Sequence, residues 1–436
     1  MPAPKKRLVT AEDLYSLQQL SNVSISPDGG HVAYRIQRVD RKTEKKYGNL
    51  WIVPSGGGEP RQFTHGNQSD YSPSWSPDGN TIAFLSSRAG NDNPQIHLIP
   101  FDGGEARKLT SIDGEIDLVG WSPDGRKLLC TIRKTDTEEL EREKDEQKKK
   151  LGVVVRHYTR LFYKMDGYGY LPHERTHIWV VDARTGKGKQ ITEGAVHDEN
   201  FPVYSPDGRS IAYISNRTED PDANVEHDDI FVMPADGGKP RKLNNTPLGA
   251  KFFLAFSPDG KWLAYFGTEG EHLDYQNTSL WIVPVDGSEP ARNLTKKYDL
   301  HTQADIITDF GAAETVAPVW SNDGKSYLFP GGSSRVHGFE ADRHRWQEYD
   351  GSDRRRRRAG NGLVRQIPKT GGVFLRRDAR HAASPFARVG RQHGSLSDAH
   401  QPRLFCLGEV AQGGRGLVQR RGRHRPARLD HVPAQF

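Results

Sequence analysis

A short motif that recurs along the first three quarters of the chain constrains its fold more than any other feature. The motif reads Ser-Pro-Asp-Gly or a close variant, and successive glycines are 50, 46, 83, 52 and 64 residues apart. Self-similarity at this spacing indicates an array of equivalent structural units. The six copies are Ser26-Pro27-Asp28-Gly29, Trp75-Ser76-Pro77-Asp78-Gly79, Trp121-Ser122-Pro123-Asp124-Gly125, Tyr204-Ser205-Pro206-Asp207-Gly208, Phe256-Ser257-Pro258-Asp259-Gly260 and Trp320-Ser321-Asn322-Asp323-Gly324.

The Asp-Gly pair in each copy predicts a tight turn between two β-strands. Glycine accepts the positive φ that such a turn needs, and aspartate caps the turn through its own side chain. We therefore expect these residues to be structural, and we assign no catalytic, cofactor-binding or metal-binding role to them. The predicted turn residues are Asp28, Gly29, Asp78, Gly79, Asp124, Gly125, Asp207, Gly208, Asp259, Gly260, Asp323 and Gly324.

A second repeated unit lies between successive turns. It reads LWIVPSGGGEPRQFT from Leu50 and IHLIPFDGGEARKLT from Ile96, and it combines an alternating strand, a second hairpin turn and a short final strand. With the β-type run after each Asp-Gly, such as TIAFL from Thr81, this makes four antiparallel strands per repeat. Four-stranded units of roughly 40–50 residues, repeated in this way, predict an all-β fold, the β-propeller. We expect the aromatic residue before Ser-Pro to pack between neighbouring blades.

Two segments depart from this β pattern. Residues 11–17 read AEDLYSL, and Thr10 followed by Asp13 predicts a short helix with a relaxed capping box. Residues 134–160 form a charged insertion in the longest repeat, and its first part, KTDTEELEREKDEQKKK, has no apolar face. The insertion is either an arm that binds a partner or gates a site, or a solvated insertion within a blade, helical or disordered. Its composition favours the second interpretation.

Composition excludes several classes of protein. The chain has 436 residues, of which 34% are hydrophobic, and no run of 18 apolar residues occurs, so we expect no membrane span. The start, MPAPKKRLVTAEDL, has no apolar segment behind its basic residues, which argues against a secretory signal. The two cysteines, Cys130 and Cys406, are too few for a disulfide framework or a multi-cysteine zinc site. We expect a cytoplasmic protein with no cofactor and no membrane partner.

The charge of the chain changes abruptly after residue 331. Residues 1–331 carry 40 Lys and Arg against 47 Asp and Glu, a net charge of −7. Residues 332–436 carry 21 Arg and 1 Lys against 9 acidic residues, a net charge of +13. We therefore predict a β-propeller at 1–331 and an Arg-rich tail at 332–436 that is unfolded.

The composition of the tail has two explanations. Arginine without lysine is typical of GC-rich coding DNA read in the wrong frame, and codons exist for which residues 429–436, read one nucleotide later, give WIMYPPNF. Residues 341–346 can likewise be read as LIDIDG, a strand followed by Asp-Gly. A frameshift between residues 329 and 341 is our main hypothesis. The alternative is a true basic tail whose Arg354–Arg358 run binds nucleic-acid phosphates, which the lack of interleaved aromatic residues disfavours.

The body resembles the propeller of the prolyl oligopeptidase family of serine peptidases, in its acylaminoacyl-peptidase branch. The resemblance covers about residues 8–331 and is carried by residues 10–14, by the repeated turns, and most specifically by LFYKMDGYGYLPHERTHIWVVDARTGKGKQIT from Leu161 to Thr192. It implies a seven-bladed propeller, of which about six blades are readable, in front of an α/β-hydrolase domain that carries the catalytic Ser, Asp and His. It also implies that the propeller narrows access to the active site and so selects peptides.

The catalytic part of such a peptidase is not readable in this sequence. No Gly-x-Ser-x-Gly pentapeptide occurs, although a hydrolase of this class presents its serine on that turn. Histidines such as His173 and His337 lack zinc-type spacing, and we expect them to be solvated surface residues. We therefore predict no catalytic residue, and we interpret the chain as the substrate-gating propeller of a cytoplasmic serine peptidase for short or N-acylated peptides. It would be truncated before the hydrolase domain, through which peptides would be its partners, and inactive alone.

Two other functions are compatible with the sequence. One is a stand-alone propeller that acts as a protein-interaction scaffold, similar to Tol-system propellers, which share the Ser-Pro-Asp-Gly turns. The other is nucleic-acid binding through the tail. The stretch from Leu161 to Thr192 and the missing secretory signal favour the peptidase interpretation over the scaffold.

Overall fold

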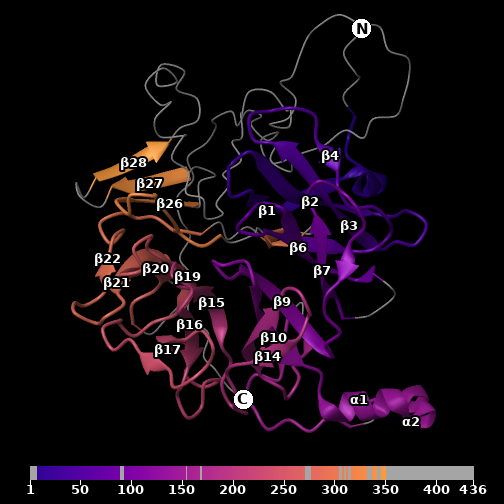
Figure 1. Ribbon diagram of the computed structural model, residues 1–436. Helices are drawn as coiled ribbons and strands as arrows, with labels where there is room; N and C mark the ends of the chain where they lie inside the picture. The colour runs from indigo at the N-terminus through magenta and orange to yellow at the C-terminus, as the bar shows by residue number, and fades with distance from the viewer. Residues whose placement is uncertain are drawn as a thin grey trace, which may run out of the picture.

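The computed structural model describes residues 7–88, 93–153, 155–166, 169–270, 276–303, 307–308, 311–312, 316–330, 336–340 and 345–349. In this part of the chain, six four-stranded antiparallel sheets are arranged around a common centre (Figure 1). Neighbouring sheets contact each other through their first strands. This is the architecture of a β-propeller, so the predicted all-β fold with about six readable blades is confirmed.

We number the sheets in chain order. Sheets 1 and 2 are each formed by four consecutive strands, whereas sheet 3 is interrupted by the insertion. Sheet 1 contains β1 (Gln18–Ile25), β2 (His31–Val39), β3 (Lys46–Pro54) and β4 (Arg61–Gln62). Sheet 2 contains β5 (Asp70–Trp75), β6 (Thr81–Ser86), β7 (Gln95–Pro100) and β8 (Arg107–Lys108). Sheet 3 contains β9 (Gly114–Trp121), β10 (Lys127–Lys134), β13 (Thr176–Asp182) and β14 (Gly188–Gln190). Sheet 3 is therefore the one interrupted by the insertion, between its second and third strands.

The last three sheets follow one another along the chain. Sheet 4 contains β15 (Asn200–Tyr204), β16 (Ser210–Asn216), β17 (Asp228–Pro234) and β18 (Arg241–Lys242). Sheet 5 contains β19 (Lys251–Phe256), β20 (Trp262–Gly267), β21 (Ser279–Pro284) and β22 (Arg292–Asn293). Sheet 6 contains β25 (Val319–Trp320), β26 (Ser326–Pro330), β27 (Val336–Glu340) and β28 (Arg345–Tyr349). Two hairpins lie outside these sheets: β11 (Lys164–Met165) with β12 (Gly169–Tyr170), and β23 (Ile307–Thr308) with β24 (Gly311–Ala312).

Successive side chains of one strand enter different cores, because strand residues alternate between the two faces of a sheet. In β6, Ile82 and Phe84 pack with residues of sheet 1, including Leu50. Ala83 and Leu85 on the opposite face pack with residues of sheet 3, including Leu128. A sheet enclosed between two neighbours needs apolar residues on both faces. The second strand of a repeat therefore reads as a continuous apolar run.

The tryptophans before Ser-Pro lie between neighbouring sheets, as predicted. Trp75 of sheet 2 packs in the core that it shares with sheet 1, and its Nε1 donates a hydrogen bond to the Ser24 carbonyl at 3.2 Å. Trp121 of sheet 3 makes the equivalent bond to the Ser74 carbonyl of sheet 2, at 3.0 Å. Each indole therefore links its own sheet to the preceding one through both apolar contact and a directed hydrogen bond.

The six predicted turns share one geometry. Their glycines have φ values between 69° and 74°, in the region that only glycine adopts without strain. In the third turn, Asp124 Oδ1 accepts hydrogen bonds from Ser122 Oγ at 2.6 Å and from the Arg126 amide at 3.1 Å. The Ser122 hydroxyl in turn accepts from the Lys127 amide at 2.9 Å. Serine and aspartate together therefore satisfy the backbone where β10 begins.

The two segments that depart from the β pattern are both structured at least in part. Residues Ala11–Ser16 form a 3-10 helix, η1, and the Thr10 amide donates to Asp13 Oδ2 at 2.8 Å as in a capping box. In the insertion, α1 (Thr137–Lys144) and α2 (Glu146–Leu151) bury no residue, and they project away from the sheets (Figure 1). The charged segment is thus a solvated helical hairpin. None of the described helices is long and apolar enough to cross a membrane.

Sheet 6 continues past the boundary that the sequence predicts at residue 331. Strand β27 pairs with β26 from Ser326↔Glu340 to Pro330↔Val336, and β28 pairs with β27. The predicted boundary is therefore too early, because strands that read as part of the tail complete the sixth sheet. The remainder of the predicted tail, including Arg354–Arg358 and Cys406, lies outside the described residues.

Candidate ligand pocket

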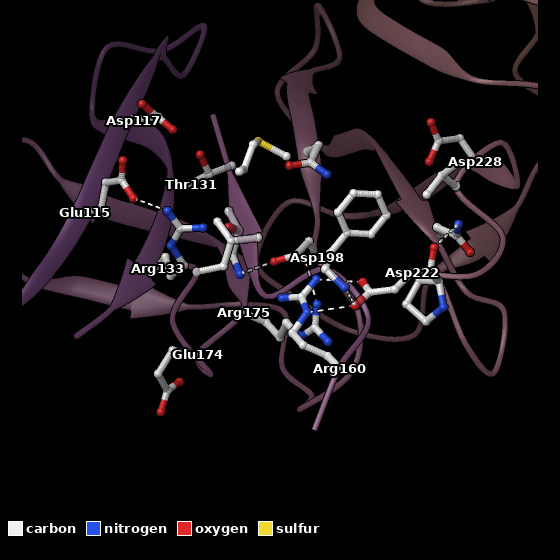
Figure 2. Close-up of a pocket in the computed structure, with 18 residues that line it drawn as sticks. Glu115, Asp117, Thr131, Arg133, Arg160, Glu174, Arg175, Asp198, Asp222 and Asp228 are labelled. Carbon is white, nitrogen blue, oxygen red and sulfur yellow. Dashed lines mark hydrogen bonds and ion pairs between the residues drawn. The ribbon is translucent and has the colours of Figure 1, made fainter. Parts of the chain in front are cut away.

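A pocket of about 470 Å³ lies where the insertion returns to sheets 3 and 4. Glu115 and Asp117 come from β9, and Thr131 and Arg133 from β10. Further lining residues come from the insertion, from β15 and β16, and from the loop between β16 and β17. Figure 2 labels Arg160 and Arg175 of the insertion and Asp222 of the loop. Segments far apart in the sequence therefore meet at one end of the ring of sheets.

The ion pair between Arg160 and Asp222 joins the insertion to sheet 4. Arg160 Nε and Nη2 donate to the two oxygens of Asp222 at 2.9 and 2.6 Å, and the Phe162 amide donates to Asp222 Oδ2 at 2.9 Å (Figure 2). Burial alone would raise the pKa of Asp222, but these hydrogen bonds outweigh it and hold the pKa below its usual value. Asp222 is therefore ionised at neutral pH.

Two further arginines of the pocket are paired in the same way. Arg175 Nη1 donates to Asp198 Oδ2 at 3.1 Å, and Asp198 Oδ1 also accepts from the Thr176 amide at 2.7 Å. Arg133 pairs with Glu115 across two adjacent strands. All three guanidinium groups of the pocket are thus held by carboxylates of its own walls.

The pocket carries an excess of negative charge. Six carboxyl groups and three guanidinium groups line it, and after the three ion pairs Asp117, Glu174 and Asp228 are left over. Neither Asp117 nor Glu174 makes an ion pair with a residue that the structure describes. Burial raises the pKa of Asp117, and it raises the pKa of Asp228 to about 6, so both groups lose their negative charge at a higher pH than an ordinary carboxylate. Cationic groups of a ligand would therefore be attracted to this end of the molecule.

A buried polar network lies next to the pocket but is fully occupied by internal partners. His177 Nδ1 lies 2.7 Å from Glu199 Oε2, and His177 Nε2 lies 3.0 Å from the Gly194 carbonyl. The Thr192 hydroxyl donates to Glu199 Oε2 at 2.8 Å, and Arg217 pairs with the other oxygen of Glu199. A carboxylate with this many partners is a structural tie between sheets 3 and 4.

The predicted turn residues and the pocket occupy different places. The six Asp-Gly turns join the first and second strands of each sheet, and none of their residues lines the pocket. His173 is exposed, as expected, while the side chain of His337 lies outside the described residues. Among the residues that can be described, no group of three or more His, Cys, Asp or Glu side chains is arranged to hold a metal ion.

The stretch from Leu161 to Thr192, which carries the family resemblance most specifically, supplies one wall of the pocket. Phe162, Met165, Leu171 and Arg175 all line it. Sequence reasoning missed the acidic residues of the other walls. Alternation along β9, which brings Glu115 and Asp117 to the same face, was the one readable signal for them.

Comparisons with known proteins agree with this architecture. The model of the TolB beta propeller domain matches residues 18–154. The uncharacterized peptidase YuxL of Bacillus subtilis is 33% identical over 75% of this chain and 49% of its own length. Dipeptidyl-peptidase 5 of Porphyromonas gingivalis is 30% identical over 67% of this chain and 44% of its own. The chain thus spans about half the length of these relatives.

A solved structure supports the fold independently. The acylaminoacyl peptidase of Pyrococcus horikoshii superposes with a TM-score of 0.56 and 18% identity, over 78% of this chain and 47% of that one. At this level of identity the likeness concerns the arrangement of the blades. Together with the relatives, it relates the described sheets to the propeller half of larger proteins.

Proposed function

We propose, on the premise that this chain belongs to the prolyl oligopeptidase family of peptidases, that it is the substrate-gating propeller of a cytoplasmic enzyme for short or N-acylated peptides. A relative named as a peptidase aligns with 75% of the chain and a second with 67% of it, and these alignments are the observation that carries the proposal. The sequence contains no Gly-x-Ser-x-Gly turn, so bond cleavage would need a hydrolase domain that this sequence does not provide.

The pocket supports a role in selecting small ligands. Its volume of about 470 Å³ falls in the range typical of small-molecule sites, roughly 300–1,000 Å³. Its walls combine apolar side chains, such as Phe162 and Val225, with the carboxylates of Asp117 and Glu174, which make no ion pair within 4 Å with a described residue. Such a surface suits a short peptide with a positive charge, at its amino terminus or on a side chain. A folded protein domain would be too large to enter.

Calorimetric titration of the 436-residue chain tests this proposal directly. Ala-Ala-Phe and its N-acetylated form are matched ligands that differ in the amino-terminal charge. If the pocket selects short peptides by their amino-terminal charge, the free peptide should bind more tightly, and the Asp117→Asn/Glu174→Gln double variant should lower that affinity about tenfold. Tighter binding of the acetylated peptide would instead favour N-acylated substrates. The Asp102→Asn variant, at an exposed hairpin, is the control. Absence of binding heat with both peptides would contradict a ligand-selecting pocket.

The same chain should not hydrolyse acyl-peptide or aminoacyl chromogenic substrates, because no serine stands in a recognisable triad context. Turnover that is blocked by a serine-directed fluorophosphonate, with the label on this chain, would overturn this expectation.

A stand-alone Tol-like scaffold is the second candidate, since the matching domain model is that of the TolB propeller. DNA sequence of the locus separates the two functions. If a shifted frame after residue 329 encodes more blades and a hydrolase domain, the frameshift hypothesis and the peptidase proposal are both supported. If the frame is intact and no hydrolase follows, the scaffold is favoured.

A further inference from the structure

We propose that Asp222 is a positioning residue that latches one wall of the pocket in place, and that its release opens the pocket. The wall consists of residues 155–166, which we call the strap. That the opening admits a peptide rests on the proposed function, whereas the latch itself rests on the contacts of the strap alone.

Asp222 is the single attachment of the strap to the sheets by polar contacts. Within the part of the chain that is described, every hydrogen bond or ion pair from the strap to a four-stranded sheet or its loops ends on this carboxylate. Other hydrogen bonds and ring contacts of the strap stay within the insertion, such as the Leu171 amide that donates to the Tyr163 carbonyl at 2.9 Å, and the Arg156 guanidinium over the Tyr170 ring. Besides the chain connections to β10 and β13, the strap and its hairpin are therefore joined to the body by polar contacts at this one carboxylate.

Apolar contact contributes to this attachment unevenly along the strap. Val155 is 80% exposed and Leu161 is 68% exposed, and Tyr158, Phe162, Tyr163 and Met165 are also exposed. Val155 and Leu161 therefore contribute only a small part of their possible burial energy, whereas the other four side chains are 37% to 46% exposed and gain about half of theirs. The charge-assisted hydrogen bonds to Asp222 are the directional part of the attachment, and all three are lost together when the carboxylate is removed.

The carboxylate is anchored more firmly than the strap. Asp222 is only 8% exposed, and its own amide donates to Asp220 Oδ1 at 3.1 Å. The same Asp220 oxygen accepts from the Ala223 amide at 3.2 Å, and Asn216 Nδ2 donates to the Asn224 carbonyl at 2.6 Å. The loop between β16 and β17 is therefore braced by its own hydrogen bonds. When the latch breaks, the strap is the part that is free to move.

Arg160 and Phe162 also line the pocket, and this links the latch to access. Arg160 covers the side of the pocket nearest to Asp222, where Figure 2 shows the two side chains directed toward one another. Movement of the strap would remove these two side chains from the pocket wall together. The pocket would then be wider and more acidic, because Asp222 would lose its cationic partner.

Hydrogen exchange followed by mass spectrometry tests the latch without any ligand. The amide of Phe162 is a direct reporter, since it donates to Asp222. In the Asp222→Asn variant of the full chain, we expect peptides covering the strap to exchange about tenfold faster. Peptides from β20 should be unchanged, since that strand lies in sheet 5. Unchanged exchange in the strap would overturn the proposal.

Two further variants separate the latch from general damage to the loop. Arg160→Met removes the strap side of the ion pair and leaves the loop intact, so it should reproduce the faster exchange even if Asp222→Asn proves unstable. Asp220→Asn weakens the same loop without touching the strap, and strap exchange should stay close to that of the wild type. Equal acceleration by Asp220→Asn and Asp222→Asn would contradict a specific latch.

Stopped-flow binding of Ala-Ala-Phe then tests the consequence for access. Opening of the strap should raise the association rate constant several-fold in Arg160→Met relative to the wild type. Faster exchange without peptide binding by any variant would support the latch and refute only the proposed peptide ligand. An association rate that is unchanged while the strap exchanges faster would overturn the claim that release opens the pocket.

Discussion

Pro77 of one turn packs against Gly125 of the next: a Cβ atom on Gly125 would lie 3.5 Å from Pro77 Cδ. The same relation joins Pro123 to Gly208, at 3.5 Å. Each Ser-Pro-Asp-Gly turn therefore contacts the turn of the following sheet, so that the motif shapes its own hairpin and also the spacing between blades.

Replacing Gly125 with alanine should lower the free energy of unfolding by about 1 kcal/mol, because its φ of 70° disfavours any residue with a Cβ atom. The contact with Pro77 is of ordinary van der Waals length and adds little. Urea unfolding measures the change. Gly56→Ala is the matched control, since a Cβ there meets nothing within 4 Å and should be nearly neutral. Equal stability of the two variants would show that the turn tolerates a side chain.

Asp124→Ala should also lower stability by about 1 kcal/mol, since the Ser122 hydroxyl and the Arg126 amide lose their acceptor. Asp102→Ala is a suitable control, because this exposed hairpin aspartate has no side-chain hydrogen bond among the described residues. Thermal melting of both variants checks the prediction. An unchanged melting temperature for Asp124→Ala would show that the turn does not depend on its carboxylate.

Lys251→Met should be the most damaging of these substitutions, at about 3 kcal/mol. Lys251 is 1% exposed, and its Nζ donates to the carbonyls of Asp228, Pro247 and Gly249 at 2.6, 2.7 and 3.0 Å. Methionine fills a similar volume but leaves three carbonyl groups without a donor. Lys242→Met removes only an exposed ion pair with Asp229 and should cost less than about 1 kcal/mol in the same unfolding assay.

Stability should depend on pH through Asp228, whose pKa is raised to about 6 by burial. The folded state binds this proton more tightly than the unfolded state, so the contribution is present at low pH and lost as pH rises from about 4 to 6. Asp228→Asn should therefore gain stability relative to the wild type over this range, as measured by melting at several pH values.

Asp124→Asn is the control of opposite sign, because hydrogen bonds from Ser122 and Arg126 lower the pKa of Asp124. The difference in stability between Asp124→Asn and the wild type should shrink as the pH falls below about 4, because protonation removes the stabilising charge of Asp124 from the wild type. A difference between Asp228→Asn and the wild type that stays constant with pH would contradict the raised pKa of Asp228.

The repeated hairpins could be predicted because their chemistry is local. An Asp-Gly pair with a serine two residues before it satisfies its own backbone, as the bonds of Asp124 show. Thr10 and Asp13 were readable for the same reason. The tryptophans before Ser-Pro were placed correctly because a large aromatic side chain at the end of a first strand has few buried positions other than the interface with a neighbour.

The boundary and the pocket depended on contacts between distant residues. The segments VHGFE from Val336 and RWQEY from Arg345 contain none of the repeated turn motif and lie in the Arg-rich part of the sequence, and they form strands by pairing outward from β26. The ion pair of the latch joins Arg160 of the insertion to Asp222 of sheet 4, and neither residue's neighbours in the sequence indicate which residue it will pair with. The geometry of a turn depends on residues that are neighbours in the chain, whereas this ion pair depends on the packing of sheet 3 beside sheet 4, which brings residues far apart in the sequence within hydrogen-bonding distance.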